Sequence, residues 1–297
     1  MNINLVVDLG QSGTRIKVGD QITALGIAKT ASSNVFETLE LIFQQVPKQD
    51  FETVYLSLTG LYGVVSEEQV IGELCQKYFN SKHVAVMDDG IAAFVGALGN
   101  QSGVVLTLGG GVVAISSNVG KFGHADGKGA IFGDLGGGFW VGQTAMRRAI
   151  ATLDGRDNAT DLVELLRSEL QEHQKLESKN GVEAVTLCIN ATKTVTTGAE
   201  AGVASAIEIL HTGADYLGKT VLGVWRKVSK SDAEIPNVCI MGGPTRNQTY
   251  VDLIKRAVSS LIECNFVTPK SDHLVGAPLA AELYPGGVDP LFKWSHL

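Results

Sequence analysis

The chain has 297 residues, of which 44% are hydrophobic and 19% charged, and its formal net charge is −7 at pH 7. These proportions exclude a disordered chain, and the length accommodates one large domain or two ordinary ones. The acidic balance offers no basic stripe for nucleic acid, so a small molecule is the expected partner.

The chain begins with MNINLVVDLG, which lacks the basic start of a secretory signal, and no apolar run approaches a membrane span of about 18 residues. Its four cysteines lie far apart and form no CxxC pair, as is typical of reduced thiols. We therefore expect a cytoplasmic protein that binds neither membranes nor nucleic acid. The sequence leaves a homodimer open.

The first hundred residues predict three short strands, followed by alternating helices and strands. Few residues separate the first strands, and such short connections indicate antiparallel hairpins. Apolar residues spaced by three and four predict the helices. The expected elements are strands Leu5–Leu9, Thr14–Val18, Ile22–Ala28, Val54–Leu58 and His83–Met87, and helices Val35–Gln45, Glu67–Phe79 and Asp89–Leu98.

The second half restarts this order. Its expected elements are strands Val104–Leu108, Val112–Ser116 and Lys121–Phe122, a helical stretch over about 138–228, strand Val238–Met241, helix Tyr250–Ile262, strand Phe266–Thr268 and helix Gly276–Leu283. Each half opens with a strand, a glycine turn and a strand. The pattern predicts an α/β fold with a duplicated βββαβα unit and a ligand cleft between the copies. The predicted lobes are residues 1–100, which segment 284–297 could join, and 101–283 with the helical insertion.

Glycine is concentrated in one part of the chain. Residues 103–142 hold 13 of the 35 glycines. Because glycine weakens helices and strands, so dense a cluster favours close approach of the backbone to a ligand. A set of tight turns is the alternative.

One segment matches the sequence expression of a phosphate-binding P-loop but lacks the structural context that a P-loop needs. The segment from Gly213 to Thr220 fits G-x-x-x-x-G-K-T. A true P-loop needs a strand before the loop, because the loop's N–H groups then precede a helix. Apolar residues at helical spacing run from Ala204 through to Trp225 instead. We therefore predict one continuous helix with small residues at a packing contact.

Four other segments carry candidate chemistry. Asp8-x-Gly10-x-Ser12-Gly13-Thr14-Arg15 is a turn after a strand, whose N–H groups can face phosphate while Asp8 holds Mg²⁺ through water. Asp89 follows a strand and starts a helix, where a carboxylate can act as general base or merely cap the helix. Gly109–Gly111, with residues 133–142, predicts a second phosphate loop in which Asp134 makes another metal contact. Gly242-Gly243 follows a strand and would let a flat ring lie on the backbone. An ordinary turn remains the alternative at the first and last segments.

Together the four segments resemble those of the sugar kinase, heat-shock chaperone and actin superfamily of ATPases. The resemblance is strongest to the BadF/BadG/BcrA/BcrD-type ATPase family and its N-acetylglucosamine kinases. It implies two actin-like (ribonuclease H-like) lobes with ATP and Mg²⁺ in the cleft. It also implies ATP-dependent phosphorylation of a hydroxyl of an amino sugar or hexose, N-acetylglucosamine or glucosamine foremost.

The resemblance carries roles onto matching positions. Asp89 matches the catalytic base, and Asp8 and Asp134 match the acids near the metal. The positions implied for nucleotide binding are Gly10, Gln11, Ser12, Gly13, Thr14, Arg15, Gly109, Gly110, Gly111, Gly242, Gly243 and Asn247. Those implied for the sugar are Asp89, Lys128, Gly129, Asp134 and Gly137.

The chain departs from the family pattern near the second loop. The usual Gly-Thr-Gly-Ser reads Gly109-Gly110-Gly111-Val112 here, Val113 stands where an asparagine often meets the sugar, and Lys128 replaces a common tryptophan. These changes leave the sugar open. Two alternatives remain: an ATPase activator of a 2-hydroxyacyl-CoA dehydratase, which needs cysteines for an iron–sulfur cluster, and a sugar- or nucleotide-sensing relative without turnover.

Overall fold

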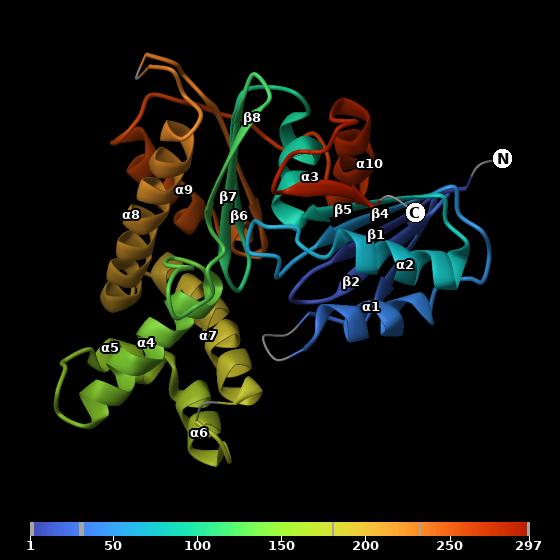
Figure 1. The fold of residues 1–297 in the computed structure, drawn as a ribbon. Helices are drawn as coiled ribbons and strands as arrows, with labels where there is room; N and C mark the ends of the chain where they lie inside the picture. Colours follow the sequence, from blue (N-terminus) through green and yellow to red (C-terminus); the bar gives the residue numbers. More distant parts are fainter. Residues whose placement is uncertain (1–2, 30–32, 180, 232, 296–297) are drawn as a thin grey trace. The chain divides into compact units, whose positions relative to one another are not determined.

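The computed structural model describes residues 3–29, 33–179, 181–231 and 233–295. The chain is α/β with two sheets, and its packing forms two compact units (Figure 1). Unit 1 comprises Met1–Val105, Ile115–His124 and Thr268–Leu297, and unit 2 comprises Leu106–Ala114 and Ala125–Val267. The lobe boundaries predicted from the sequence stay a prediction, because a unit of close packing and a lobe of a duplicated fold need not coincide.

The sheet of unit 1 confirms the predicted hairpins. Its order is β11-β5-β4-β1-β2-β3. β1 pairs antiparallel with β2, β2 does so with β3, and β1, β4 and β5 run parallel to one another. The strands are β1 (Leu5–Leu9), β2 (Thr14–Val18), β3 (Gln21–Leu25), β4 (Thr53–Leu58), β5 (His83–Asp88) and β11 (Phe292–Ser295). The sequence did not predict β11, which pairs antiparallel with β5 at the sheet edge.

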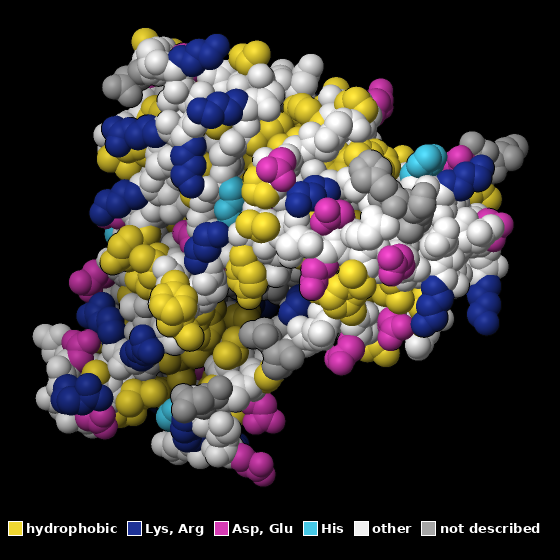
Figure 2. Space-filling model, viewed as in Figure 1, with side chains coloured by type: hydrophobic (Ala, Val, Ile, Leu, Met, Phe, Trp, Pro, Cys, Tyr) yellow, Lys and Arg dark blue, Asp and Glu magenta, His cyan; other side chains and the backbone are white. Residues whose placement is uncertain are grey.

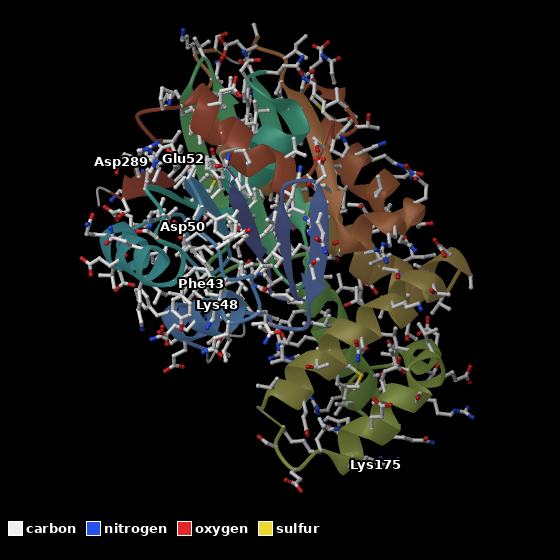
Figure 3. The ribbon with its side chains drawn as sticks, turned by 90° about the vertical axis from the view of Figure 1, so that its right-hand side faces the viewer. Phe43, Lys48, Asp50, Glu52, Lys175 and Asp289 are labelled. Carbon is white, nitrogen blue, oxygen red and sulfur yellow. The ribbon has the colours of Figure 1, made fainter. Side chains whose placement is uncertain are left out.

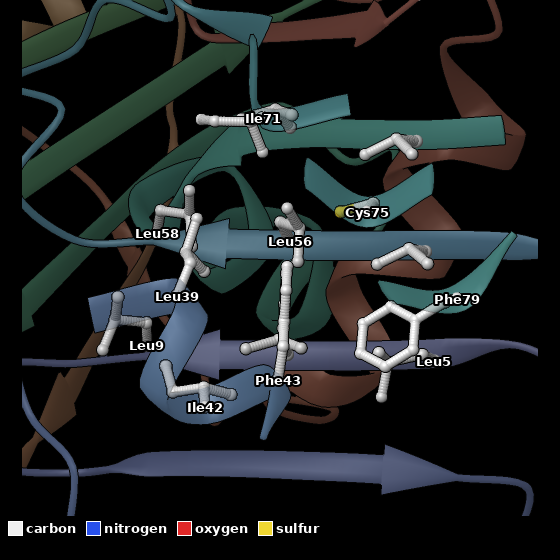
Figure 4. Packing of buried hydrophobic residues seen from close by; sticks show 14 of the residues in the cluster. Leu5, Leu9, Leu39, Ile42, Phe43, Leu56, Leu58, Ile71, Cys75 and Phe79 are labelled. Carbon is white, nitrogen blue, oxygen red and sulfur yellow. The ribbon is translucent and has the colours of Figure 1, made fainter. Parts of the chain in front are cut away.

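Helices α1 (Val35–Phe43) and α2 (Glu68–Phe79) cover one face of this sheet (Figure 4). Leu5, Val7 and Leu9 belong to the core cluster under these helices. Side chains alternate between the faces of a strand, so Asp8 lies on the opposite face of β1. That alternation positions the first candidate site residue away from the apolar core.

Helices α3 (Asp89–Leu98) and α10 (His273–Leu283) pack against each other, and α10 also contacts β1 and β4. Their backbones approach closely at two glycines. A Cβ built on Gly276 would overlap the carbonyl of Ala92, and one built on Gly96 would overlap that of Asp272. The contact fixes the helix that follows Asp88 beside the helix that follows Asp272.

The second sheet repeats the order of the first. It reads β10-β9-β6-β7-β8, and once the edge strand β11 is left out of the first sheet, the first strand of each set lies in the middle. Its strands are β6 (Gly103–Leu108), β7 (Val112–Asn118), β8 (Lys121–Asp126), β9 (Asn237–Gly242) and β10 (Asn265–Phe266). The shared order confirms the predicted duplication of the βββαβα unit.

The described residues of the predicted helical stretch form five helices: α4 (Gly138–Leu153), α5 (Thr160–Leu165), α6 (Arg167–Lys175), α7 (Val182–Glu200) and α8 (Ala204–Arg226). The residues that spell a P-loop lie inside α8, and the element before α8 is helix α7 and not a strand, as predicted. Helix α9 (Gln248–Ser259) follows a short 3₁₀ helix, Gly243–Arg246. Across the described ranges, no helix is long and apolar enough to cross a bilayer. Basic and acidic side chains both occur on the face seen in Figure 2.

Candidate functional site

Strand register gathers polar groups around Asp8. The register places Asp8 opposite Arg15 on β2 and opposite Ser57 on β4. Arg15 donates to Asp8 Oδ2 from Nη2 at 2.6 Å and from Nε at 3.2 Å, and the Ser57 hydroxyl lies 3.2 Å from Oδ1. Only 12% of the Asp8 side chain is exposed. The carboxylate is therefore held in place from both neighbouring strands.

Arg15 connects this carboxylate to a residue far along the chain. Its Nη1 donates to Asp272 Oδ2 at 2.5 Å, and Asp272 Oδ1 accepts from the Leu274 N–H to cap α10. Burial alone would raise the pKa of Asp272, but the hydrogen bond and charge of Arg15 hold it below its ordinary value. The sequence implied nucleotide binding for Arg15, and the structure adds this ion-pair role.

The turn between β1 and β2 is closed by its own backbone. The Gly10 N–H donates to the Gly13 carbonyl at 3.0 Å, and the Thr14 hydroxyl donates to the Ile27 carbonyl at 2.7 Å. Gln11 and Ser12, at the tip of the turn, are exposed. Thr14 is buried, so it supports the turn from behind.

The adjacent acids Asp88 and Asp89 occupy different positions at the start of α3. Asp88 is the N-cap of α3: its Oδ1 accepts from the Gly90 N–H and its Oδ2 from the Gly63 N–H, both at 3.0 Å. The interpretation of Asp89 as a helix cap is therefore wrong, because Asp89 is already the first residue of the helix. Its carboxylate has hydrogen bonds with the Thr59 side chain and the Gly90 backbone.

The pKa of Asp89 is raised to about 8. Burial is the largest cause, the negative charges of Asp88 and Asp8 add to it, and a hydrogen bond with the Thr59 side chain opposes it. The sequence predictions of Asp8 and Asp89 thus fall in one electrostatic cluster within unit 1. Thr59 and Asp88 were missed as members. The signal for Thr59 was its place at the end of β4, because parallel strands end at one edge.

In unit 2, the two halves of the glycine cluster pack on each other. The N–H groups of Gly138 and Phe139 donate to the carbonyls of Gly109 and Gly110, both at 2.9 Å. A Cβ on Gly137 would lie 3.0 Å from the Gly110 carbonyl oxygen. Part of the glycine excess therefore serves close backbone packing, and the start of α4 is occupied by protein carbonyls.

Asp134 joins these glycines to the sheet. Its Oδ1 accepts from the Val112 N–H at 3.1 Å, and its own N–H donates to Asp126 at 2.6 Å. A Cβ on Gly111 would lie 2.7 Å from Asp134 Oδ2, so only glycine leaves room for this carboxylate. Burial raises the pKa of Asp134, and the charge of Asp126 adds to the shift while N–H donors oppose it.

The proposed sugar positions near Asp134 differ in access. Lys128 is exposed, Gly129 is half-buried with a positive φ of 78°, and Gly137 is buried. The loop closes on itself, because the Gly133 N–H donates to the Gly129 carbonyl at 2.8 Å. Two apolar side chains at its tip, Ile131 and Phe132, are 87% and 88% exposed.

The two glycines at the end of β9, Gly242 and Gly243, differ in how closely other atoms approach them. A Cβ on Gly242 would overlap the Leu108 carbonyl, whereas one on Gly243 would have nothing within 4 Å. Asn247 caps α9 by accepting from the Tyr250 N–H at 2.8 Å and donates to Glu200 at 2.7 Å. The structure thus places Gly242 beside the end of β6 and gives Asn247 a structural role.

Comparison with known proteins identifies relatives over nearly the whole chain. The structure resembles that of a candidate N-acetylglucosamine kinase from Chromobacterium violaceum, with 25% identity, a TM-score of 0.69, and 94% of this chain and 98% of that chain covered. It also resembles a ROK family glucokinase from Streptomyces griseus, with 16% identity, a TM-score of 0.61, and coverage of 96% and 100%. A search among curated proteins finds no significant match. The sequence profile described as the BadF/BadG/BcrA/BcrD ATPase family matches residues 5–281, and the chain therefore belongs to that family.

Proposed function

We propose that this protein is an ATP-dependent carbohydrate kinase that phosphorylates a hydroxyl of an amino sugar or hexose. The observation that carries the proposal is Asp89. It starts a helix at a strand end, bonds with Thr59, and lies in the field of Asp8 beside the first glycine turn. The likeness to a candidate N-acetylglucosamine kinase at 25% identity supports the same reaction class.

Asp89 would act as the general base. It accepts the proton of the substrate hydroxyl while the hydroxyl oxygen bonds to the γ-phosphorus. The bond from that phosphorus to the β–γ bridging oxygen breaks, and ADP leaves with the electron pair. A pKa of about 8 suits this role, because a base is most effective when its pKa is near the working pH.

The glycine turns would bind the nucleotide. The exposed tip of the first turn, Gln11 and Ser12, would offer N–H groups to phosphate oxygens. In the second loop Gly110 and Gly111 would do the same, because the Gly109 N–H already donates to the Gly111 carbonyl at 2.9 Å. A Cβ on Gly243 would meet nothing within 4 Å, which supports an adenine ring lying on the backbone there. Phosphoryl transfer depends mainly on such positioning and on electrostatic stabilisation.

The acids fit Mg²⁺ held through water better than by direct ligation. Asp8 and Asp134 already accept hydrogen bonds from protein donors. In the parts of the chain that the structure describes, no three His, Cys, Asp or Glu side chains gather as a metal site. When bound, Mg²⁺ would neutralise charge on the β- and γ-phosphates. Asp8 is the better placed holder, because Asp134 is buried behind Gly111.

N-acetylglucosamine and glucosamine are the first substrates to test. Lys128 is exposed and Gly129 half-buried on the loop before Asp134, and they are our proposed sugar contacts together with Asp89. Glucose stays among the candidates because the structure resembles that of a glucokinase. At 16% identity this likeness supports the shared fold and does not select the sugar.

The deciding experiment measures ADP release with Mg²⁺ and ATP against a panel of hexoses, free amino sugars and N-acetylated sugars. We expect release to depend on one sugar class, with a phosphorylated sugar detected by mass spectrometry. Asp89→Asn should remove transfer and spare ATP binding. Thermal stabilisation by ATP or sugar without ADP release would identify a sensing protein instead. ADP release that is independent of every sugar would favour an ATPase activator.

A further inference from the structure

Lys29 has no role among the predictions made from the sequence. It follows β3, its side chain is half-buried, and its backbone lies close to the first glycine turn. Two hydrogen bonds attach its segment to that turn. The Lys29 N–H donates to the Gly10 carbonyl at 3.0 Å, and the Thr14 hydroxyl donates to the Ile27 carbonyl at 2.7 Å. The backbone of Lys29 is thus part of the turn's support.

The side chain of Lys29 extends to the loop that holds Thr59. A Cβ built on Gly60 would lie 3.5 Å from Lys29 Cε and 4.0 Å from Nζ. Gly60 adopts a φ of 81°, and its neighbour Thr59 bonds with Asp89. The lysine therefore spans the distance from the phosphate turn to the residue beside the proposed base.

The ammonium of Lys29 is partly withdrawn from water. Nζ donates to the Ser33 carbonyl at 2.6 Å, and burial lowers the pKa of Lys29. Fewer surrounding waters strengthen the attraction of this ammonium to a phosphate.

We propose that Lys29 contacts the terminal phosphate of bound ATP and stabilises the charge on the phosphoryl group as it moves toward the substrate hydroxyl. The inference rests on the proposed kinase function and adds a residue to it. The place of the lysine favours the γ-phosphate over the rest of the nucleotide, because its side chain lies beside Gly60, the residue after Thr59.

The test is binding of two nucleotides by isothermal titration calorimetry, with equal Mg²⁺ throughout. The probes are adenylyl imidodiphosphate, which has a third phosphate and resists hydrolysis, and ADP. Lys29→Met keeps the apolar stem over Gly60 and removes the charge. We expect it to weaken binding of the triphosphate by about 10- to 100-fold, the loss of one hydrogen bond to a charged group, with ADP affinity within about threefold of wild type. Lys29→Arg should recover part of the loss.

Lys48→Met is the matched control. Lys48 follows α1, its side chain is exposed, and it lies close to Asp50 in sequence (Figure 3). We expect this variant to bind both nucleotides as wild type does. Equal losses for both nucleotides in Lys29→Met, or no loss for either, would overturn the role of Lys29. Failure of wild type to bind nucleotide would instead refute the proposed function, so the two failures are distinguishable.

Discussion

Arg15 and Asp272 are paired at 2.5 Å, although 257 positions separate them in the chain. The pair connects the hairpin that carries the first glycine turn to the cap of α10. Asp272 has two functions, because Oδ2 accepts from Arg15 while Oδ1 accepts from the Leu274 N–H. These functions can be separated by mutation.

Asp272→Asn keeps the cap and weakens the ion pair. The two side chains are 39% and 42% exposed, so the free energy of unfolding should fall by less than about 1 kcal/mol. Asp272→Ala removes the cap as well and should cost roughly a further 1 kcal/mol. Urea denaturation of both variants measures the difference. Equal stabilities for the two variants would show that the cap contributes nothing.

Gly111 and Gly109 lie in the same loop but differ in their surroundings, so the same substitution can be compared at both. A Cβ on Gly111 meets Asp134 Oδ2 at 2.7 Å, whereas one on Gly109 meets nothing within 4 Å. Gly111→Ala should therefore lower the free energy of unfolding by roughly 1–3 kcal/mol, and Gly109→Ala should change it by less than about 0.5 kcal/mol.

The same two variants test the second phosphate loop. If Gly109 faces a phosphate, Gly109→Ala should weaken ATP binding while leaving the melting temperature unchanged. Calorimetry of ATP binding beside a thermal melt separates the two effects. Unchanged ATP affinity in Gly109→Ala would remove this residue from the proposed nucleotide contacts.

The sequence predicted most of the fold because its signals were local. Alternating apolar residues and short turns identified the hairpins around Gly10, and helical spacing placed Gly213–Thr220 inside α8. β11 was missed because Phe292–Ser295 is four residues long and its strand character depends on the exposed edge of β5. Helix α10 begins at His273, before the predicted start, because Asp272 caps it.

The candidate site was harder to predict where it depends on distant partners. Sequence alone could not choose which of Asp88 and Asp89 caps α3, since a shift of one residue exchanges their roles. The Arg15–Asp272 pair depends on how α10 packs, which no local pattern records. The glycine cluster was found as a cluster, but its division into exposed turn and packed backbone required the contacts of Gly137 and Gly138 with the first loop.

The P-loop letters inside α8 give a third prediction. Lys219 lies 5.8 Å from the ring centroid of Tyr216, and a Cβ on Gly218 would lie 3.1 Å from the Ala257 backbone of α9. Lys219→Ala should leave ATP binding unchanged, whereas Gly218→Ala should lower the melting temperature by forcing the helices apart. Nucleotide titration and thermal melts measure these outcomes. Loss of ATP binding in a folded Lys219→Ala variant would contradict the assignment of this segment to packing.

The raised pKa of Asp89 predicts how stability varies with pH. In the unfolded chain an aspartic acid titrates near about 3.9, and in the folded protein Asp89 titrates at about 8. Between these values the native carboxyl keeps its proton and the unfolded one loses it. The free energy of unfolding should therefore fall as pH rises through this window, and the contribution should level off above about pH 8. Urea denaturation from pH 5 to 9 should give a steeper fall for wild type than for Asp89→Asn.

The same ionisation predicts the pH dependence of the proposed transfer. Asp89 must be ionised to accept a proton, so kcat/KM should rise with pH and level off near pH 8. The charges of Asp8 and Asp88 and the hydrogen bond with Thr59 contribute to this pKa of Asp89. Thr59→Val removes that bond, which favours the charged form, and should move the rising limb to higher pH. Initial rates across pH 6–9 measure both profiles. Two results would exclude Asp89 as the base. One is a wild-type rate that does not change with pH. The other is a Thr59→Val profile that rises at the same pH as wild type, because this variant lacks the bond that favours the ionised Asp89.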